Sequence, residues 1–186
     1  MSPKEIMEIL EQNPVIAAVG DDKWEAALQS PVQVIFYLAA SLLTVAQRVQ
    51  EAHAAEKCVM VHLDLAEGIG RDRVGIQYLA DLGVDGIIST RAQLIRLTKE
   101  RGLLAIQRFF ALDSKGIESM EEMLHSTNPD LMEIMPGVIG KIIHQFSHGH
   151  VPVIAGGLIQ TKAEVTEALS NGAAAVSTGK QELWYV

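Results

Sequence analysis

Two small-residue segments near the end of the chain have the composition of an anion-binding site. Gly156 and Gly157 follow one aliphatic run, and a second run ends in Ser177, Thr178 and Gly179. Glycine has no Cβ, so the backbone N–H groups around it can approach a bound anion closely. The pattern predicts that these two segments hold a phosphate together.

Charged or titratable side chains stand near the ends of other apolar runs, at Lys23, His62, Asp64, Arg108 and Glu133. A charged group inside an apolar strand is costly unless it is paired or works at a site. The guanidinium of Arg108 offers a fork of donors that suits phosphate. Two interpretations remain open. These groups line a ligand cavity, or the last four satisfy one another in a polar layer that binds nothing.

Eight apolar segments alternate with amphipathic ones, and together they must position these groups. The predicted strands cover residues 14–19, 32–38, 57–65, 86–90, 104–110, 130–136, 151–158 and 173–179. The predicted helices cover residues 3–12, 22–29, 41–55, 72–82, 91–101, 114–126, 137–147 and 162–171. Near-continuous apolar strands in this alternation are typical of a parallel sheet covered on both faces. Eight units favour closure into an α/β barrel of the (β/α)₈ TIM type, formed by residues 1–186 as one domain. The loops after strands seven and eight of such barrels commonly hold phosphate.

The barrel predicted for this chain is compact, because 186 residues are fewer than the roughly 250 that such folds typically use. Its last helix is missing or truncated, since the chain ends soon after the eighth strand at Leu183-Trp184-Tyr185-Val186. We expect this apolar end to be buried against a partner subunit or under the barrel floor. A homo-oligomer is therefore predicted.

The net charge of −8 and the pI of about 5.2 argue against a nucleic-acid binder that uses its whole surface. The charge is uneven, however, because residues 71–108 hold seven of the fifteen Lys and Arg against four acids. Six of these cations form either a solvated helix face or a binding surface. They are Arg71, Arg73, Arg91, Arg96, Lys99 and Arg101.

The remaining composition excludes several classes of protein. Cys58 is the single cysteine, so no disulfide framework exists, and we expect a chain that works in the cytoplasm. No window approaches the roughly 18 uninterrupted apolar residues of a membrane span. His62 is the one histidine on a predicted strand, so we expect no metal site.

Five motifs resemble those of the glycerol-3-phosphate-responsive antiterminator family, over about residues 14–184. They are HLDLAEGI at 62–69, GIISTR at 86–91, AIQRFFALD at 105–113, EIMPG at 133–137 and IAGGLIQT at 154–161. The resemblance implies a TIM-barrel regulator and no enzyme, with glycerol 3-phosphate as its effector and no cofactor. It also implies binding to the leader mRNA of a glycerol-utilisation operon, which prevents termination.

Carried onto this sequence, the resemblance gives each candidate group a role. The phosphate would be held by Gly156, Gly157, Ser177, Thr178, Gly179 and Arg108. Asp64 and Glu133 would face the glycerol hydroxyls, with Lys23 and His62 in the same cavity. The six cations between residues 71 and 101 would bind RNA, mainly through phosphates. The chain departs from the family pattern at residues 36–41, FYLAAS, where the family tends to carry a polar or glycine-bearing stretch.

Two other functions remain open. The first is a phosphate-binding TIM-barrel enzyme, of the isomerase type, that acts on a small phosphosugar with Asp64 and Glu133 as acid and base. The second is a ligand-binding module that regulates through a protein partner.

Overall fold

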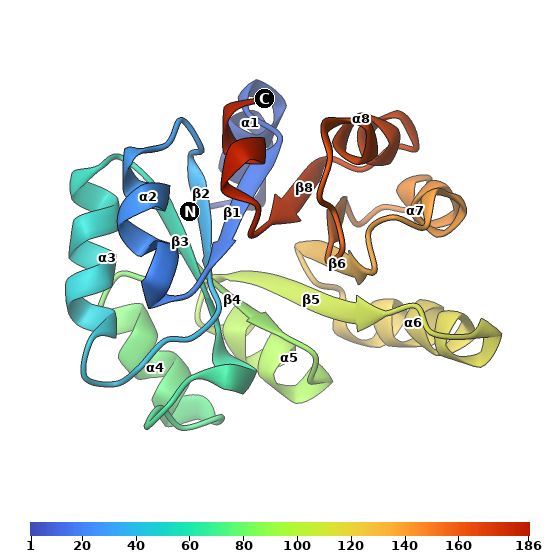
Figure 1. Cartoon of the computed structure of the whole chain (residues 1–186). Coiled ribbons are helices and arrows are strands. Elements are labelled where there is room, and N and C mark those ends of the chain that lie inside the picture. Colours follow the sequence, from blue (N-terminus) through green and yellow to red (C-terminus); the bar gives the residue numbers. More distant parts are fainter.

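Eight parallel strands close into a barrel in the computed structural model, which describes residues 1–186 (Figure 1). Each strand pairs with the next along the chain, and β8 pairs with β1. The strands are β1 (Val15–Val19), β2 (Val34–Tyr37), β3 (Cys58–His62), β4 (Gly86–Ser89), β5 (Leu104–Phe110), β6 (Leu131–Met135), β7 (Val153–Gly156) and β8 (Ala175–Thr178). The predicted TIM barrel is confirmed.

Helices follow the first seven strands and surround the barrel (Figure 1). They are α2 (Trp24–Gln29), α3 (Val45–Ala54), α4 (Arg73–Asp81), α5 (Ala92–Glu100), α6 (Ser114–Thr127), α7 (Gly140–Ser147) and α8 (Lys162–Ser170). One further helix, α1 (Pro3–Gln12), precedes the barrel and begins with a capping box at Ser2 and Glu5. None of the helices is long and apolar enough to cross a bilayer.

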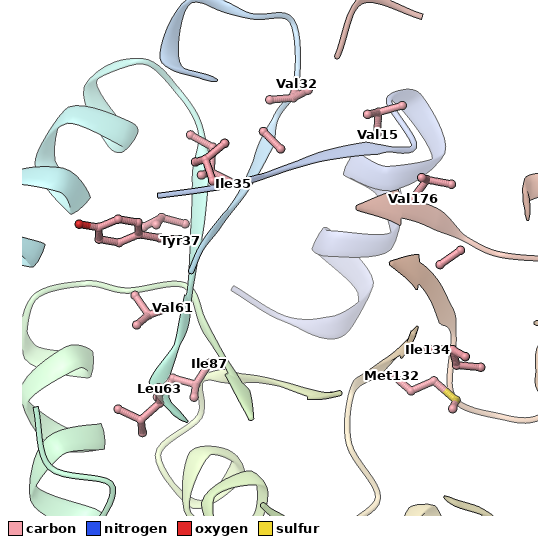
Figure 2. Close-up of a cluster of buried hydrophobic side chains, with 14 of the residues drawn as sticks. Val15, Val32, Ile35, Tyr37, Val61, Leu63, Ile87, Met132, Ile134 and Val176 are labelled. Atoms are coloured by element: carbon pink, nitrogen blue, oxygen red, sulfur yellow. The ribbon is translucent and has the colours of Figure 1, made fainter. Parts of the chain in front are cut away.

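Alternation along the strands divides the apolar residues into two layers. Side chains such as Phe36, Met60 and Ile106 fill the barrel, where Ile6 and Leu10 of α1 join them and close its amino-terminal end. The second layer lies between the strands and the surrounding helices. Figure 2 shows part of that layer, including Val61 and Ile134 on strands far apart around the barrel.

The end of the chain packs within its own fold. A 3-10 helix, η3 (Gln181–Tyr185), lies beside β1 and β8 in place of an eighth outer helix. Leu183 is buried and Trp184 is only 1% exposed. The indole Nε1 of Trp184 donates a hydrogen bond of 2.9 Å to the carbonyl of Thr178. The prediction that the apolar end needs a partner subunit or the barrel floor is therefore wrong for these two residues.

Two predicted boundaries differ in ways that matter for the site. The helix expected from Ser41 begins at Val45, because Ser41 instead forms a β-bridge with Glu67. The third strand ends at His62, and Asp64 lies in a short 3-10 helix, η2 (Leu63–Leu65). His62 and Asp64 therefore do not share a strand face, as the spacing predicted.

Candidate functional site

A cavity of about 480 Å³ opens at the carboxyl ends of the strands, mainly over β7 and β8. Seven of the predicted site residues line it: Lys23, Arg108, Glu133, Gly157, Ser177, Thr178 and Gly179. Gly156, His62 and Asp64 do not line it. The structure thus brings both small-residue segments to one opening, and it brings Arg108 and Glu133 to the same place.

The backbone around Gly157 and Gly179 has free hydrogen-bond donors. Gly157 and Leu158 have positive φ angles of 74° and 61°, so the chain turns through the left-handed region directly after β7. No group of the chain accepts a hydrogen bond from the N–H groups of Gly157, Leu158 or Gly179, and all three residues line the cavity. Successive N–H groups in such a turn form an anion-binding concavity.

Gly156 has a packing role beneath the cavity. A Cβ at this position would overlap Oε1 of Glu133 and would lie 2.7 Å from Oγ of Ser177. Its carbonyl accepts a 2.5 Å hydrogen bond from the N–H of Gly137, which ties the loop after β6 to β7. The predicted contact between Gly156 and phosphate stays a prediction.

Arg108, Glu133 and Ser177 form a buried polar group at the floor of the cavity. Nε of Arg108 donates to Oε2 of Glu133 at 2.6 Å, and Oγ of Ser177 donates to Oε1 at 2.5 Å. Glu133 is only 1% exposed, so its carboxylate depends on these two donors. The Nη groups of Arg108 have no partner in the chain and remain available to a ligand.

His62 is buried inside the barrel without a hydrogen-bond partner at either ring nitrogen. Its Nε2 lies 3.7 Å from Oδ2 of Asp64, beyond hydrogen-bonding distance. Burial lowers the pKa of His62 to about 4, and the charge of Arg108 acts in the same direction. The imidazole is therefore neutral at neutral pH, with one nitrogen that can donate and one that can accept.

Asp64 fastens the loop after β4. It accepts hydrogen bonds from the hydroxyls of Ser89 and Thr90, both at 2.9 Å, and from the N–H of Thr90 at 2.7 Å. Nε of Arg91 lies 3.6 Å away. Burial alone would raise the pKa of Asp64, but these hydrogen bonds outweigh it and lower the pKa. Of the four groups in the alternative polar layer, only Arg108 and Glu133 satisfy one another, because Asp64 is held by Ser89 and Thr90 and His62 has no partner.

Lys180 lines the cavity and was not among the predicted site residues. Its place directly after the Ser177-Thr178-Gly179 segment was the signal that could have found it. Lys23 lies across the same opening, where its Nζ donates to the carbonyl of Gly179 at 2.8 Å. The hydroxyl of Thr178 donates to the carbonyl of Ile159 at 2.9 Å, so it serves the loop after β7.

The predicted RNA-binding cations lie on or beside α4 and α5, and several of them have acidic partners. Arg73 pairs with Glu100 at 2.9 Å, and Lys99 pairs with Asp130 at 3.0 Å. Arg71, Arg96 and Arg101 are exposed and form no ion pair. Whether the six cations bind RNA stays a prediction.

The fold and the cavity define the class of this protein: a TIM barrel whose cavity, over its last two strands, is lined by free backbone N–H groups and three cationic side chains. Within that class, the chain belongs to the family of the glycerol-3-phosphate responsive antiterminator, whose model matches residues 15–184. The resemblance drawn from the sequence motifs is confirmed.

Similar proteins support this assignment. The chain is 34% identical to the Escherichia coli (strain K12) protein YgcP, over 96% of this chain and 95% of that one. The crystal structure of a glycerol uptake operon antiterminator regulatory protein from Listeria monocytogenes superposes with a TM-score of 0.87 and 34% identity, covering 92% of this chain and 95% of that one. An antiterminator-related protein from Thermotoga maritima gives a TM-score of 0.83 and 31% identity, covering 91% and 96%.

A more distant similarity shows the fold alone. A putative deoxyribose-phosphate aldolase from Coccidioides immitis superposes with a TM-score of 0.70 at 13% identity, covering 95% of this chain and 84% of that one.

Proposed function

We propose that the cavity binds glycerol 3-phosphate and that this ligand controls binding of the chain to the leader mRNA of a glycerol-utilisation operon. One observation carries the ligand proposal. Three backbone N–H groups without acceptors, at Gly157, Leu158 and Gly179, line the same cavity as the guanidinium of Arg108. Backbone donors and arginine are the groups with which proteins most often hold a phosphate ester.

The charges that line the cavity suit a phosphate dianion. Lys23, Arg108 and Lys180 contribute three positive charges, and Glu133 contributes one negative charge, which leaves a balance of +2. This local balance is opposite in sign to the net charge of −8 on the whole chain. The cavity therefore attracts an anion that the rest of the surface repels.

The glycerol end of the ligand faces the polar groups deeper in the barrel. Glu133 lies at the floor of the cavity, where its carboxylate can accept a hydrogen bond from a glycerol hydroxyl. The neutral ring of His62 lies behind this lining, near Arg108, with both of its nitrogens unused. Leu38, from the segment that departs from the family pattern, supplies an apolar side of the cavity.

Asp64 links this interior to the basic surface. It lies 3.7 Å from His62 on one side, and on the other it holds Thr90 and lies 3.6 Å from Arg91, at the start of α5. A ligand that engages Arg108 changes the surroundings of His62 and Asp64 and, through Asp64, the position of Arg91. We propose this contact chain as the route by which ligand alters RNA binding, a role that places the chain in the cytoplasm.

The alternative of a phosphosugar isomerase has less support. Its acid and base would be Asp64 and Glu133, yet Asp64 lies outside the cavity and already accepts three hydrogen bonds. Glu133 is held by Arg108 and Ser177. We therefore propose a regulatory role without turnover.

Two measurements test the proposal. Calorimetric titration with glycerol 3-phosphate, glycerol and inorganic phosphate should show the tightest binding for glycerol 3-phosphate, weak binding for phosphate and none for glycerol. Fluorescence anisotropy with a leader RNA should then show an affinity that changes when glycerol 3-phosphate is added. Equal RNA affinity with and without the ligand would refute the control step. Ligand binding without any RNA binding would favour a protein partner, and turnover of triose or pentose phosphates would favour the enzyme.

A further inference from the structure

A patch of exposed apolar side chains surrounds a shallow pocket beside the mouth of the barrel. The pocket, of about 250 Å³, is lined by Leu42, Ile69, Val74 and Tyr78, together with three glycines and Asp72, the N-cap residue of α4. Next to it, Leu43 is 91% exposed, and Val74 is 76% exposed. Large apolar side chains this exposed, on the loop after β2 and at the start of α4, mark an interaction surface.

The backbone holds this patch in a fixed shape. The loop between β2 and α3 and the segment between β3 and α4 run through the lower left of Figure 1, and the bridge between Ser41 and Glu67 joins them. The N–H of Leu42 donates to the carbonyl of Glu67 at 2.9 Å, and the N–H of Glu67 donates to the carbonyl of Ala40 at 2.8 Å. Leu43 therefore projects from a paired segment, and little order has to be gained when a partner binds.

The charges at the edge of the patch complement one another. Glu67 and Arg71 are both exposed, lie on the same segment and form no ion pair within the chain. A projecting leucine, an apolar pocket, one free carboxylate and one free guanidinium thus share one small surface. In a two-fold symmetric dimer the same patch is used by both copies, so each projecting group meets its complement in the other copy.

We propose that this patch is the interface of a homodimer, in which Leu43 of each copy enters the pocket formed by Leu42, Ile69, Val74 and Tyr78 of the other. Glu67 of each copy then pairs with Arg71 of the other across the two-fold axis. This inference does not depend on the ligand or on RNA. The dimer nevertheless bears on ligand binding and RNA binding, because it brings the segments before α4 of the two copies to one side of the assembly.

The test measures the mass of the full chain in solution by light scattering and by sedimentation at micromolar concentration. The wild type should have twice the 20.2 kDa of one chain, and Leu43→Glu should have 20.2 kDa. Leu112→Glu is the matched control, because Leu112 is 82% exposed on the loop after β5, away from the patch. This variant should remain dimeric. Thermal melts should show a folded chain for both variants: Leu112→Glu should melt as the wild type does, and Leu43→Glu should melt at a lower temperature, because the monomer lacks the stabilisation that association gives.

A charge exchange tests the orientation of the two copies. Glu67→Arg and Arg71→Glu should each weaken dimerisation about tenfold, and the double exchange should restore it. A monomeric wild type would overturn the proposal and leave the patch to a different partner. A dimer that survives Leu43→Glu, or that Leu112→Glu disrupts equally, would also overturn it, because the interface would then lie elsewhere.

Discussion

Replacing Arg108 by methionine, alone and together with Glu133→Gln, separates the stability of the barrel from its ability to bind a phosphate. Arg108 supplies the one cation that pairs with Glu133, through a contact of 2.6 Å, and Glu133 is only 1% exposed. Its removal leaves a buried carboxylate with a single donor, Ser177. Breaking a buried ion pair in this way costs about 3 to 5 kcal/mol of unfolding free energy. Urea denaturation of Arg108→Met should show a loss in that range.

The double variant Arg108→Met with Glu133→Gln removes both charges and keeps an acceptor oxygen for the Ser177 hydroxyl. Replacing a buried ion pair by neutral groups is often close to neutral, so most of the lost stability should return. Binding of glycerol 3-phosphate should not return, because the Nη donors are still missing. A lost charge-assisted contact of about 2 to 4 kcal/mol corresponds to roughly 30- to 1,000-fold weaker binding by calorimetry.

The contrast between the two variants decides the role of Arg108. If both variants bind glycerol 3-phosphate as tightly as the wild type, Arg108 does not contact the phosphate and our account of the site is wrong. If the double variant is as unstable as the single one, Glu133 is not held by Arg108 in the way the geometry indicates.

Three further changes test other parts of the account. Gly157→Ala places a side chain at a φ of 74°, with its Cβ 2.7 Å from Cε of Met135. Thermal melts should show a loss of about 1 to 2 kcal/mol in unfolding free energy, and ligand binding should be weaker. An unchanged ligand affinity would show that this turn does not form part of the site. Because burial lowers the pKa of His62 from 6.5 to about 4, the folded chain binds fewer protons than the unfolded chain in this window. The unfolding free energy should therefore fall as the pH drops from 6.5 to 4, by up to about 1.4 kcal/mol per pH unit. In urea melts, His62→Leu should flatten this dependence of stability on pH. An unaltered dependence would exclude His62 as its source. Arg96→Glu with Arg101→Glu should weaken leader-RNA binding and reduce its salt slope by about 1.4, whereas the same exchange at two exposed lysines of other helices should not. Equal losses in both would argue against a localised surface.

The fold could be predicted because each strand is a nearly continuous apolar run and several helices have their own boundary signal. Ser2 with Glu5 begins the first helix, and Thr161 with Glu164 begins α8 in the same way. The place where Trp184 is buried was predicted wrongly, because the sequence does not show that η3 folds back beside β1 and β8.

The site was predicted only in part, because its geometry depends on register and on loops. Alternation along the strands puts Arg108, Glu133 and Ser177 inside the barrel, and the same rule turns the hydroxyl of Thr178 away from them. The role of Asp64 could not be predicted, since its partners, the last residue of β4 and the residue after it, lie 25 or more positions later in the chain.

The most direct test of the central claim is a crystal structure of the chain with glycerol 3-phosphate at saturating concentration. We predict a phosphate within hydrogen-bonding distance of the N–H groups of Gly157 and Gly179 and of the Nη groups of Arg108, with the glycerol end directed toward Glu133. A cavity that stays empty under these conditions, or a ligand bound at another surface, would contradict the account.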